Sequence, residues 1–461
     1  MSYGIDYCLD QIREVDLTPA RGRISHVVGM MLEGFVGHCV LGDVCEIESG
    51  SYKVLAEVVG FRENKVLLMP LGELIGVGPG SVITRLGAAA ASVGVSDALL
   101  GRVLDGLGHP IDGLPAIKTD CFYPLHATPP SHLERRRISE PLDVGIRSIN
   151  GLLTVGRGQR IGVFSGSGVG KSVLLGMMAK YTEADVNVIA LIGERGREVR
   201  EFIERDLGES GLKRSVVIVA TSDQPPLVRR RGAYLAMAIA EYFRDRDKQV
   251  LFMMDSLTRL AHVQREIGLA VGEPPTTKGY TPSVFALLPK FLERAGTTPG
   301  VGAITGIYSV LVDGDDMNDP IPDAARSILD GHMVLSRDLA RLNQYPAIDV
   351  LSSISRVMTD IVTSGQIENA RRFSELLATY KKAEDLIHIG AYKPGSSVKI
   401  DEAIAKCEVL LSYLRQGMNT RASFDDSVEE LSKVIATAPA REPGVTFDRR
   451  SVTAPRGDGA V

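Results

Sequence analysis

The fold is decided by one stretch of the chain, Ser165-Gly166-Ser167-Gly168-Val169-Gly170-Lys171-Ser172. The stretch follows an apolar run at 161–164 and precedes a helical pattern at 173–180, which gives the order strand, loop, helix. Glycines let backbone N–H groups curl around phosphate oxygens, and the N-terminus of the helix that follows adds positive potential. The stretch therefore predicts a phosphate-binding P-loop, although Ser165 stands where the general pattern has glycine. The alternative is a flexible loop with no ligand.

The side chains at the end of this loop predict a nucleotide that is bound together with Mg²⁺. Lys171 is expected to reach the β- and γ-phosphates and the Ser172 hydroxyl to ligate the metal, with Val173 closing the binding segment. An apolar run at 250–254 ends in Asp255, which is the position of the carboxylate on the magnesium side of a P-loop site. The alternative is that Asp255 caps a helix that begins near residue 257.

Hydrolysis also needs a group that activates water, and Glu194 is the candidate. A strand expected at 189–192 is followed by Gly193 and Glu194. We expect this strand to lie beside that of the P-loop, so that a carboxylate at its carboxyl end faces the phosphates. Glu194 is then placed to orient and deprotonate the attacking water. Spacing alone leaves a solvated cluster of glutamates and arginines as an equal alternative.

Composition limits the classes of function that the chain can have. The 461 residues are 44% hydrophobic and 24% charged, with a net charge of −5, which is typical of globular domains and disfavours a nucleic-acid-binding protein. The five cysteines are widely spaced without a Cys-x-x-Cys pair, so neither a zinc site nor a disulfide framework is indicated. We expect no signal peptide and no membrane span, and a cytoplasmic protein.

The pattern along the chain changes four times and predicts an α/β protein. Residues 1–20 have an amphipathic helical pattern, which predicts either a partner-docking segment or a helix packed on its own domain. Residues 21–90 hold short β-rich runs, which predict a small β-barrel or sandwich. Residues 91–363 alternate strands and helices around a parallel sheet, and 364–436 read as helices alone. Residues 437–461 predict a disordered tail. The strands expected are 24–28, 54–59, 65–69, 81–85, 161–164, 186–192, 215–221, 250–254, 303–312 and 333–335.

Several longer motifs resemble one family much more specifically than the P-loop does. They are GRGQRIGVFSGSGVGKS (156–172), LIGERGREVREF (191–202), DSLTR (255–259), GEPPTTKGYTPSVFALLPKFLERAG (272–296), DGDDMNDPIPDAARSILDGHMVLSR (313–337) and YPAIDVLSSISRV (345–357). The chain resembles the catalytic subunits of the rotary ATPase superfamily from about residue 22 to 435. Within that superfamily it is similar to the flagellar protein-export ATPases, which are closely related to the type III secretion ATPases.

The resemblance implies roles for individual residues. Glu194 matches the catalytic glutamate, which the non-catalytic subunits of the superfamily lack. Arg195 and Arg259 match arginines on the γ-phosphate side, and Tyr345 matches an aromatic residue that packs on adenine. Arg356 matches the arginine finger that a neighbouring subunit contributes. Together with Lys171, Glu194 and Arg356 form the implied catalytic set.

The resemblance also implies an assembly. It implies a homohexameric ring with a crown of β-barrels, a coiled-coil stalk protein in its centre and a stator-like regulatory protein at the N-terminal segment. Export substrates, their chaperones and the membrane export gate are further implied partners, with a cytoplasmic location at the periphery of the inner membrane. A virulence-type secretion ATPase, a ring-shaped RNA-translocating helicase and a non-catalytic nucleotide-binding subunit are the alternatives. The DGDDMNDPI segment favours the flagellar branch, the scarce aromatics of the barrel argue against RNA binding, and Glu194 argues against the non-catalytic subunit.

Overall fold

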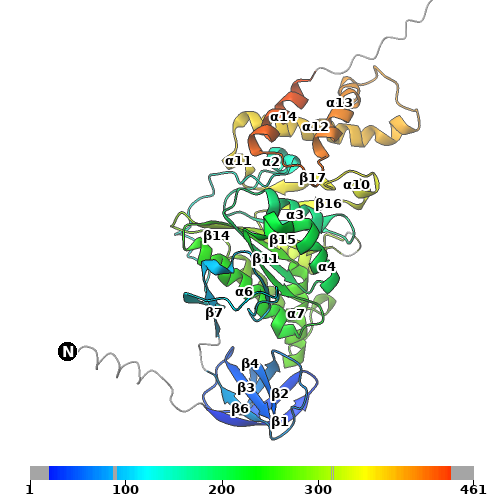
Figure 1. Cartoon of the computed structure of the whole chain (residues 1–461). Coiled ribbons are helices and arrows are strands. Elements are labelled where there is room, and N and C mark those ends of the chain that lie inside the picture. Colours follow the sequence, from blue (N-terminus) through cyan, green and yellow to red (C-terminus); the bar gives the residue numbers. More distant parts are fainter. Residues whose placement is uncertain (1–19, 87–90, 313, 315, 438–461) are drawn as a thin grey trace, which may run out of the picture.

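A computed structural model describes residues 20–86, 91–312, 314 and 316–437 of the chain. The molecule is elongated, with a barrel at one end, a layered α/β region in the middle and a group of helices at the other end (Figure 1). The segment predicted to dock a partner and the tail predicted to be disordered lie outside the described residues, apart from Ala20 and Thr437.

The N-terminal region is a closed β-barrel rather than a sandwich. The apolar side chains of its strands alternate inward, and Leu32, Ile47 and Leu68 at its centre are fully buried. The structure adds two strands to the four expected here. In order along the chain the strands are β1 (Arg21–Val28), β2 (Met31–Phe35), β3 (Val44–Ser49), β4 (Tyr52–Arg62), β5 (Lys65–Pro70) and β6 (Val82–Arg85).

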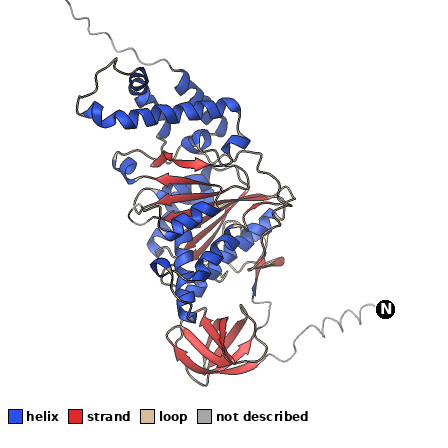
Figure 2. Ribbon diagram, turned by 180° about the vertical axis from the view of Figure 1, so that it is seen from behind, coloured by secondary structure: helices blue, strands red, loops and turns tan. Residues whose placement is uncertain are grey.

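A mostly parallel sheet forms the middle of the molecule (Figure 2). Its strands follow one another in the order β17 (Ile348–Ser355), β16 (Gly331–Leu335), β10 (Arg160–Ser165), β15 (Ala303–Leu311), β13 (Gln249–Asp255), β11 (Val186–Ile192), β12 (Ser215–Ala220) and β8 (Val103–Asp105). β17 runs antiparallel to β16, and the short β14 (Gly296–Thr297) runs antiparallel to β15. β11 is buried at every residue, as a parallel strand covered on both faces should be.

Helices cover both faces of this sheet. One face packs against α3 (Lys171–Tyr181). The apolar cluster on this side includes α2 (Arg147–Leu152) and extends into the C-terminal helices at the end of the molecule (Figure 1), α12 (Ser364–His388), α13 (Val398–Leu414) and α14 (Phe424–Ala436). The other face packs against α6 (Pro226–Arg244), α7 (Leu257–Val271), α8 (Pro282–Leu292) and α9 (Pro320–Ile328). The remaining elements are β7 (Ser92–Val95), β9 (Cys121–Pro124), α4 (Gly196–Glu201), a π-helix (Phe202–Leu207), α5 (Gly208–Leu212), α10 (Arg337–Arg341), α11 (Met358–Ile361) and two single 3₁₀ turns (Asp97–Leu99 and Thr277–Gly279).

The barrel is attached to the middle region through α6 and α7. Met69 and Leu71 of the barrel end share an apolar cluster with Leu227 of α6 and Val263 of α7. No helix in the described part of the chain is long and apolar enough to cross a membrane.

Candidate active site

The P-loop lies between β10 and α3, at the carboxyl edge of the sheet. Gly168 and Gly170 have φ angles of +77° and +87°, in the left-handed region that other residues rarely adopt. Gly170 directly precedes α3, so the loop delivers its backbone N–H groups at the helix N-terminus. The local sequence therefore dictates a phosphate cradle, with Val169 buried beneath it as an apolar anchor.

Lys171 and Asp255 form an ion pair at the base of this cradle. The Lys171 Nζ lies 2.5 Å from Asp255 Oδ1, and the Ser309 hydroxyl of β15 donates to the same oxygen over 2.6 Å. Burial lowers the pKa of Lys171, but the carboxylates of Asp255 and Glu194 outweigh burial and raise the pKa above its usual value. Lys171 therefore stays charged. Ser256 rather than Asp255 caps α7, since its hydroxyl accepts from the backbone N of Arg259.

Glu194 lies in the same cavity as Lys171, but the strand that precedes it does not lie where the sequence predicted. We expected its strand to lie beside the strand of the P-loop, and this is wrong, because β15 and β13 lie between β10 and β11. The chain reaches the cavity through Gly193, whose φ of +72° turns it beyond the end of β11. Burial and the charge of Asp255 raise the pKa of Glu194 to about 7, against the opposing charges of Lys171 and Arg259.

Most of the predicted site residues line one cavity of about 440 Å³. Arg259 and Arg195 both reach it, although Arg195 is mostly exposed and is paired with Glu198 at 3.5 Å. Among the described side chains, the buried Glu194 Oε1 and Arg259 Nε have no hydrogen-bond partner. The predicted residues that line the cavity are Ser165, Gly166, Ser167, Gly168, Gly170, Lys171, Ser172, Val173, Glu194, Arg195 and Arg259.

Tyr345 lines a second, apolar cavity of about 280 Å³ on the other side of the P-loop. Val169 and Val173 form one wall, and Tyr345 approaches so closely that a methyl group on Gly170 would lie 3.5 Å from its ring. An apolar cavity beside a phosphate cradle suits a nucleotide base.

Arg356 lies far from this site in its own subunit. β17 runs antiparallel to β16, so Ser355 at its end pairs with Gly331 at the amino edge of the sheet. The P-loop is at the opposite edge, because Ser165 pairs with Leu335 at the other end of β16. Arg356 is exposed there, and its guanidinium donates to the carbonyl oxygen of Arg326 over 3.2 Å.

Three family models match successive parts of the chain. Residues 24–87 match the ATP synthase alpha/beta family β-barrel domain, and 145–355 match the nucleotide-binding domain of the same family. Residues 362–433 match the T3SS EscN ATPase C-terminal domain. The chain is 54% identical to the flagellum-specific ATP synthase of Bacillus subtilis, over 92% of this chain and 98% of the relative. The chain belongs to the flagellar and type III secretion ATPase family.

Other members of this ATPase family are similar over the same length. The type 3 secretion system ATPase of Xanthomonas euvesicatoria is 51% identical over 90% of this chain and 94% of the relative. The structure of the assembled ATPase EscN from enteropathogenic E. coli matches with a TM-score of 0.86 and 45% identity, over 90% of this chain and all of that chain. The sequence-based predictions of family, fold class and ATP-hydrolysing enzyme of type III export are confirmed.

Two groups at the site of this ATPase were not found from the sequence. Gln416, Gly417 and Met418 of the C-terminal region line the apolar cavity, and the Gln416 backbone N donates to Tyr345 O over 2.9 Å. The Arg337 guanidinium lies against the P-loop, so that a methyl group on Gly166 would be 2.5 Å from its nitrogen. Only the LSR motif at 335–337, already part of the resemblance, could have pointed to Arg337.

Proposed function

We propose that this ATPase hydrolyses Mg-ATP as a subunit of a homohexameric ring and thereby energises protein export through the flagellar apparatus. One observation supports the chemistry most directly: Glu194, with a pKa of about 7, lines the same cavity as Lys171, which is paired with Asp255. A carboxylate whose pKa lies near the working pH is well matched to a general base.

The proposed steps use the groups of this cavity. Lys171 binds the β- and γ-phosphates in place of its present contact with Asp255. Glu194 orients the attacking water and accepts its proton, while Arg259 and Arg195 offer positive charge on the γ-phosphate side. Tyr345 packs on the adenine.

Mg²⁺ is part of the proposal, and the residues present fit it. Mg²⁺ prefers oxygen ligands and usually takes one or two from the protein, the rest coming from phosphates and water. The Ser172 hydroxyl at the start of α3 and the Asp255 carboxylate at the end of β13 would supply these oxygens. When bound, the metal neutralises charge that develops on the transferred phosphoryl group.

The position of Arg356 supports the ring. An arginine at the amino edge of the sheet does not serve a site at the carboxyl edge of the same subunit, but in a ring it can face the site of a neighbour. Such a finger makes hydrolysis depend on assembly, because the site of an isolated subunit lacks the arginine of a neighbour. EscN has been described in an assembled form and in complex with its central stalk EscO.

The family supports proposals for the remaining partners, and the pattern along the chain supports the domain limits. We propose a coiled-coil stalk protein in the ring centre and a stator-like regulator at residues 1–20, with export substrates and their chaperones reaching the helical end and the membrane export gate beyond it. The enzyme then works in the cytoplasm at the periphery of the inner membrane, without a nucleic-acid partner. We keep the predicted domains at 21–90, 91–363 and 364–436.

A virulence-type secretion system is the second candidate, because the relative from Xanthomonas euvesicatoria is nearly as similar as the flagellar ones. Two bacterial strains test the choice, one lacking its flagellar export ATPase and one lacking its virulence secretion ATPase. Each receives either the wild-type chain or Glu194→Gln. We expect the wild-type chain to restore flagellin export and motility, and the variant to fail. Recovery of effector secretion without motility would favour the virulence system, and recovery of neither by an active ATPase would contradict an export function.

A further inference from the structure

The backbone of Arg356 is held by one carbonyl group at the amino edge of the sheet. The Arg356 backbone N donates to the Asp330 carbonyl oxygen over 3.0 Å, just before β16 begins. The preceding residue, Ser355, donates its hydroxyl to the Thr154 carbonyl oxygen over 2.7 Å. The direction in which Arg356 leaves the sheet is therefore set by the contacts of Asp330 and Ser355.

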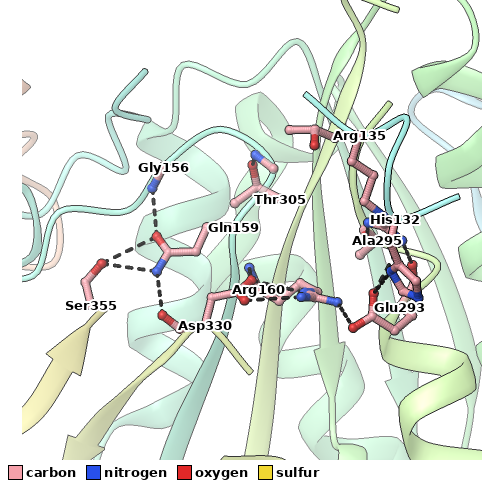
Figure 3. A network of polar contacts seen from close by, with 12 residues as sticks. His132, Arg135, Gly156, Gln159, Arg160, Glu293, Ala295, Thr305, Asp330 and Ser355 are labelled. Atoms are coloured by element: carbon pink, nitrogen blue, oxygen red, sulfur yellow. Dashed lines mark hydrogen bonds and ion pairs between the residues drawn. The ribbon is translucent and has the colours of Figure 1, made fainter. Parts of the chain in front are cut away.

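The side chain of Gln159 contacts both of these anchors (Figure 3). Its amide nitrogen donates to the Asp330 carbonyl oxygen and to the Ser355 hydroxyl, each over 3.1 Å. Its amide oxygen accepts from the Gly156 backbone N over 2.8 Å. Gln159 is fully buried, so these bonds form away from solvent, where loss of a partner leaves polar groups unpaired.

The same segment is fixed to the strand that carries the P-loop. Arg160, the first residue of β10, binds the Asp330 carboxylate through its backbone N and its guanidinium at 3.0 to 3.1 Å. Its guanidinium also pairs with Glu293 (Figure 3), with Arg160 Nη1 2.5 Å from Glu293 Oε1. β10 thus has the P-loop at one end and, at the other, the residues that hold Arg356.

From these contacts we infer that Gln159 is a positioning residue for Arg356, and so for hydrolysis at the site of the neighbouring subunit. The inference rests on the proposed role of Arg356 in the ring. Gln159 lines neither the cavity of Lys171 and Glu194 nor the apolar cavity of Tyr345, so its effect on the reaction passes through Asp330, Ser355 and the backbone of Arg356. Displacement of a catalytic group by about 1 Å can slow a reaction by about 100-fold, which makes such a support a determinant of rate.

A double-mutant cycle tests this inference in the assembled enzyme. Gln159→Leu should lower kcat by about 10- to 100-fold with the affinity for ATP unchanged. Arg356→Ala should lower kcat further, and the double variant should be no slower than Arg356→Ala alone, because both changes remove the same interaction. Ser355→Ala, which removes one anchor only, should lower kcat in the same direction by a smaller factor and provides the test if Gln159→Leu fails to fold.

Gln366→Leu is the matched control. Gln366 is also buried and its amide nitrogen donates to the carbonyl oxygens of Asn150 and Gly151 and to the Thr154 hydroxyl, without contact to Asp330 or Ser355. It should lower the melting temperature but leave kcat within about twofold of wild type. Multiplicative losses in the double variant, or a wild-type kcat in both Gln159→Leu and Ser355→Ala, would overturn the inference. Wild-type activity in Arg356→Ala would instead overturn the proposed finger itself.

Discussion

The two edges of the central sheet differ in the hydrogen bonding of the side chains near their proposed functional residues. At the carboxyl edge, Glu194 Oε1 and Arg259 Nε have no hydrogen-bond partner among the described residues. At the amino edge, the amide of Gln159 uses both its nitrogen and its oxygen. Unpaired buried groups cost stability, about 1–3 kcal/mol each, and tend to mark functional sites. The unpaired Glu194 and Arg259 atoms at the carboxyl edge are therefore available to a ligand, whereas at the amino edge the amide that we propose to position Arg356 is fully bonded.

Among the variants that test this comparison, Lys171→Ala at the carboxyl edge is expected to have the largest effect. It removes the positive charge for the β- and γ-phosphates and leaves the buried Asp255 carboxylate without its partner. Hydrolysis should be nearly abolished and nucleotide binding weakened, as measured by phosphate release and by calorimetric titration with ATP. Turnover close to that of the wild type would end the assignment of the P-loop.

At the amino edge, Arg356→Ala should lower kcat by about 1,000-fold while ATP binding is retained. The guanidinium is exposed and donates to the carbonyl oxygen of Arg326, so its loss should leave the melting temperature unchanged. Equilibrium binding of a fluorescent ATP analogue and calorimetry of unfolding check both points. A loss of binding equal to the loss of turnover would place Arg356 within its own subunit's site and break the distinction between the edges.

Glu194→Gln should slow hydrolysis by about 100-fold or more, with Mg-ATP still bound, because the amide keeps the shape of the side chain and loses the proton acceptor. In the wild type, kcat/KM should rise with pH through an apparent pKa near 7, since Glu194 acts as a base only when ionised. The variant should lose this rising limb. A variant that fails to bind nucleotide would show that Glu194 is structural.

Glu194 should also make the stability of the fold depend on pH. As the pH rises, its contribution to stability should fall, whereas kcat/KM should rise. Its pKa in the folded chain lies above the usual 4.5, so the folded state holds the proton more tightly than the unfolded chain does. That stabilising contribution is complete below pH 4.5 and is lost as the pH rises through about 7. Across this range the melting temperature of the wild type should therefore fall relative to that of Glu194→Gln, and parallel curves would contradict the shift.

The smallest effect is expected at Tyr345, in the apolar cavity beside the P-loop. Tyr345→Ala should weaken ATP binding by about 10-fold, the usual size of a lost aromatic stack on a base, with kcat less affected. Tyr345→Phe keeps the ring and should behave as the wild type. An equal loss in both variants would assign the effect to the hydroxyl rather than to stacking.

The sequence predicted the carboxyl edge better than the amino edge, for a physical reason. The P-loop is local, since strand, glycines, lysine and helix follow one another within about twenty residues. Buried parallel strands such as β11 and β13 are near-continuous apolar runs and could be recognised one by one. Their spatial order could not, and so the expectation that β11 lies beside β10 was wrong.

Contacts between segments that are distant in the chain could not be predicted from the sequence for the same reason. Gln159 and Ser355 are almost 200 residues apart, and Gln416 meets Tyr345 from another region of the chain. No local pattern marks such pairs. The edge strands β8 and β17 also escaped prediction, because three residues or a run of serines give little apolar periodicity.

A crosslink tests most directly whether each site joins the carboxyl edge of one subunit to the amino edge of the next. A tagged subunit with Lys171→Ala and Arg356→p-benzoylphenylalanine is mixed with untagged wild-type subunits and radiolabelled ATP, and the rings are irradiated. The tagged subunit does not hold ATP tightly in its own P-loop, and alone it should remain unlabelled. The account predicts that the mixture places the label on the tagged subunit, from ATP bound by its neighbour. A tagged subunit that stays unlabelled in rings shown to contain both chains would contradict it.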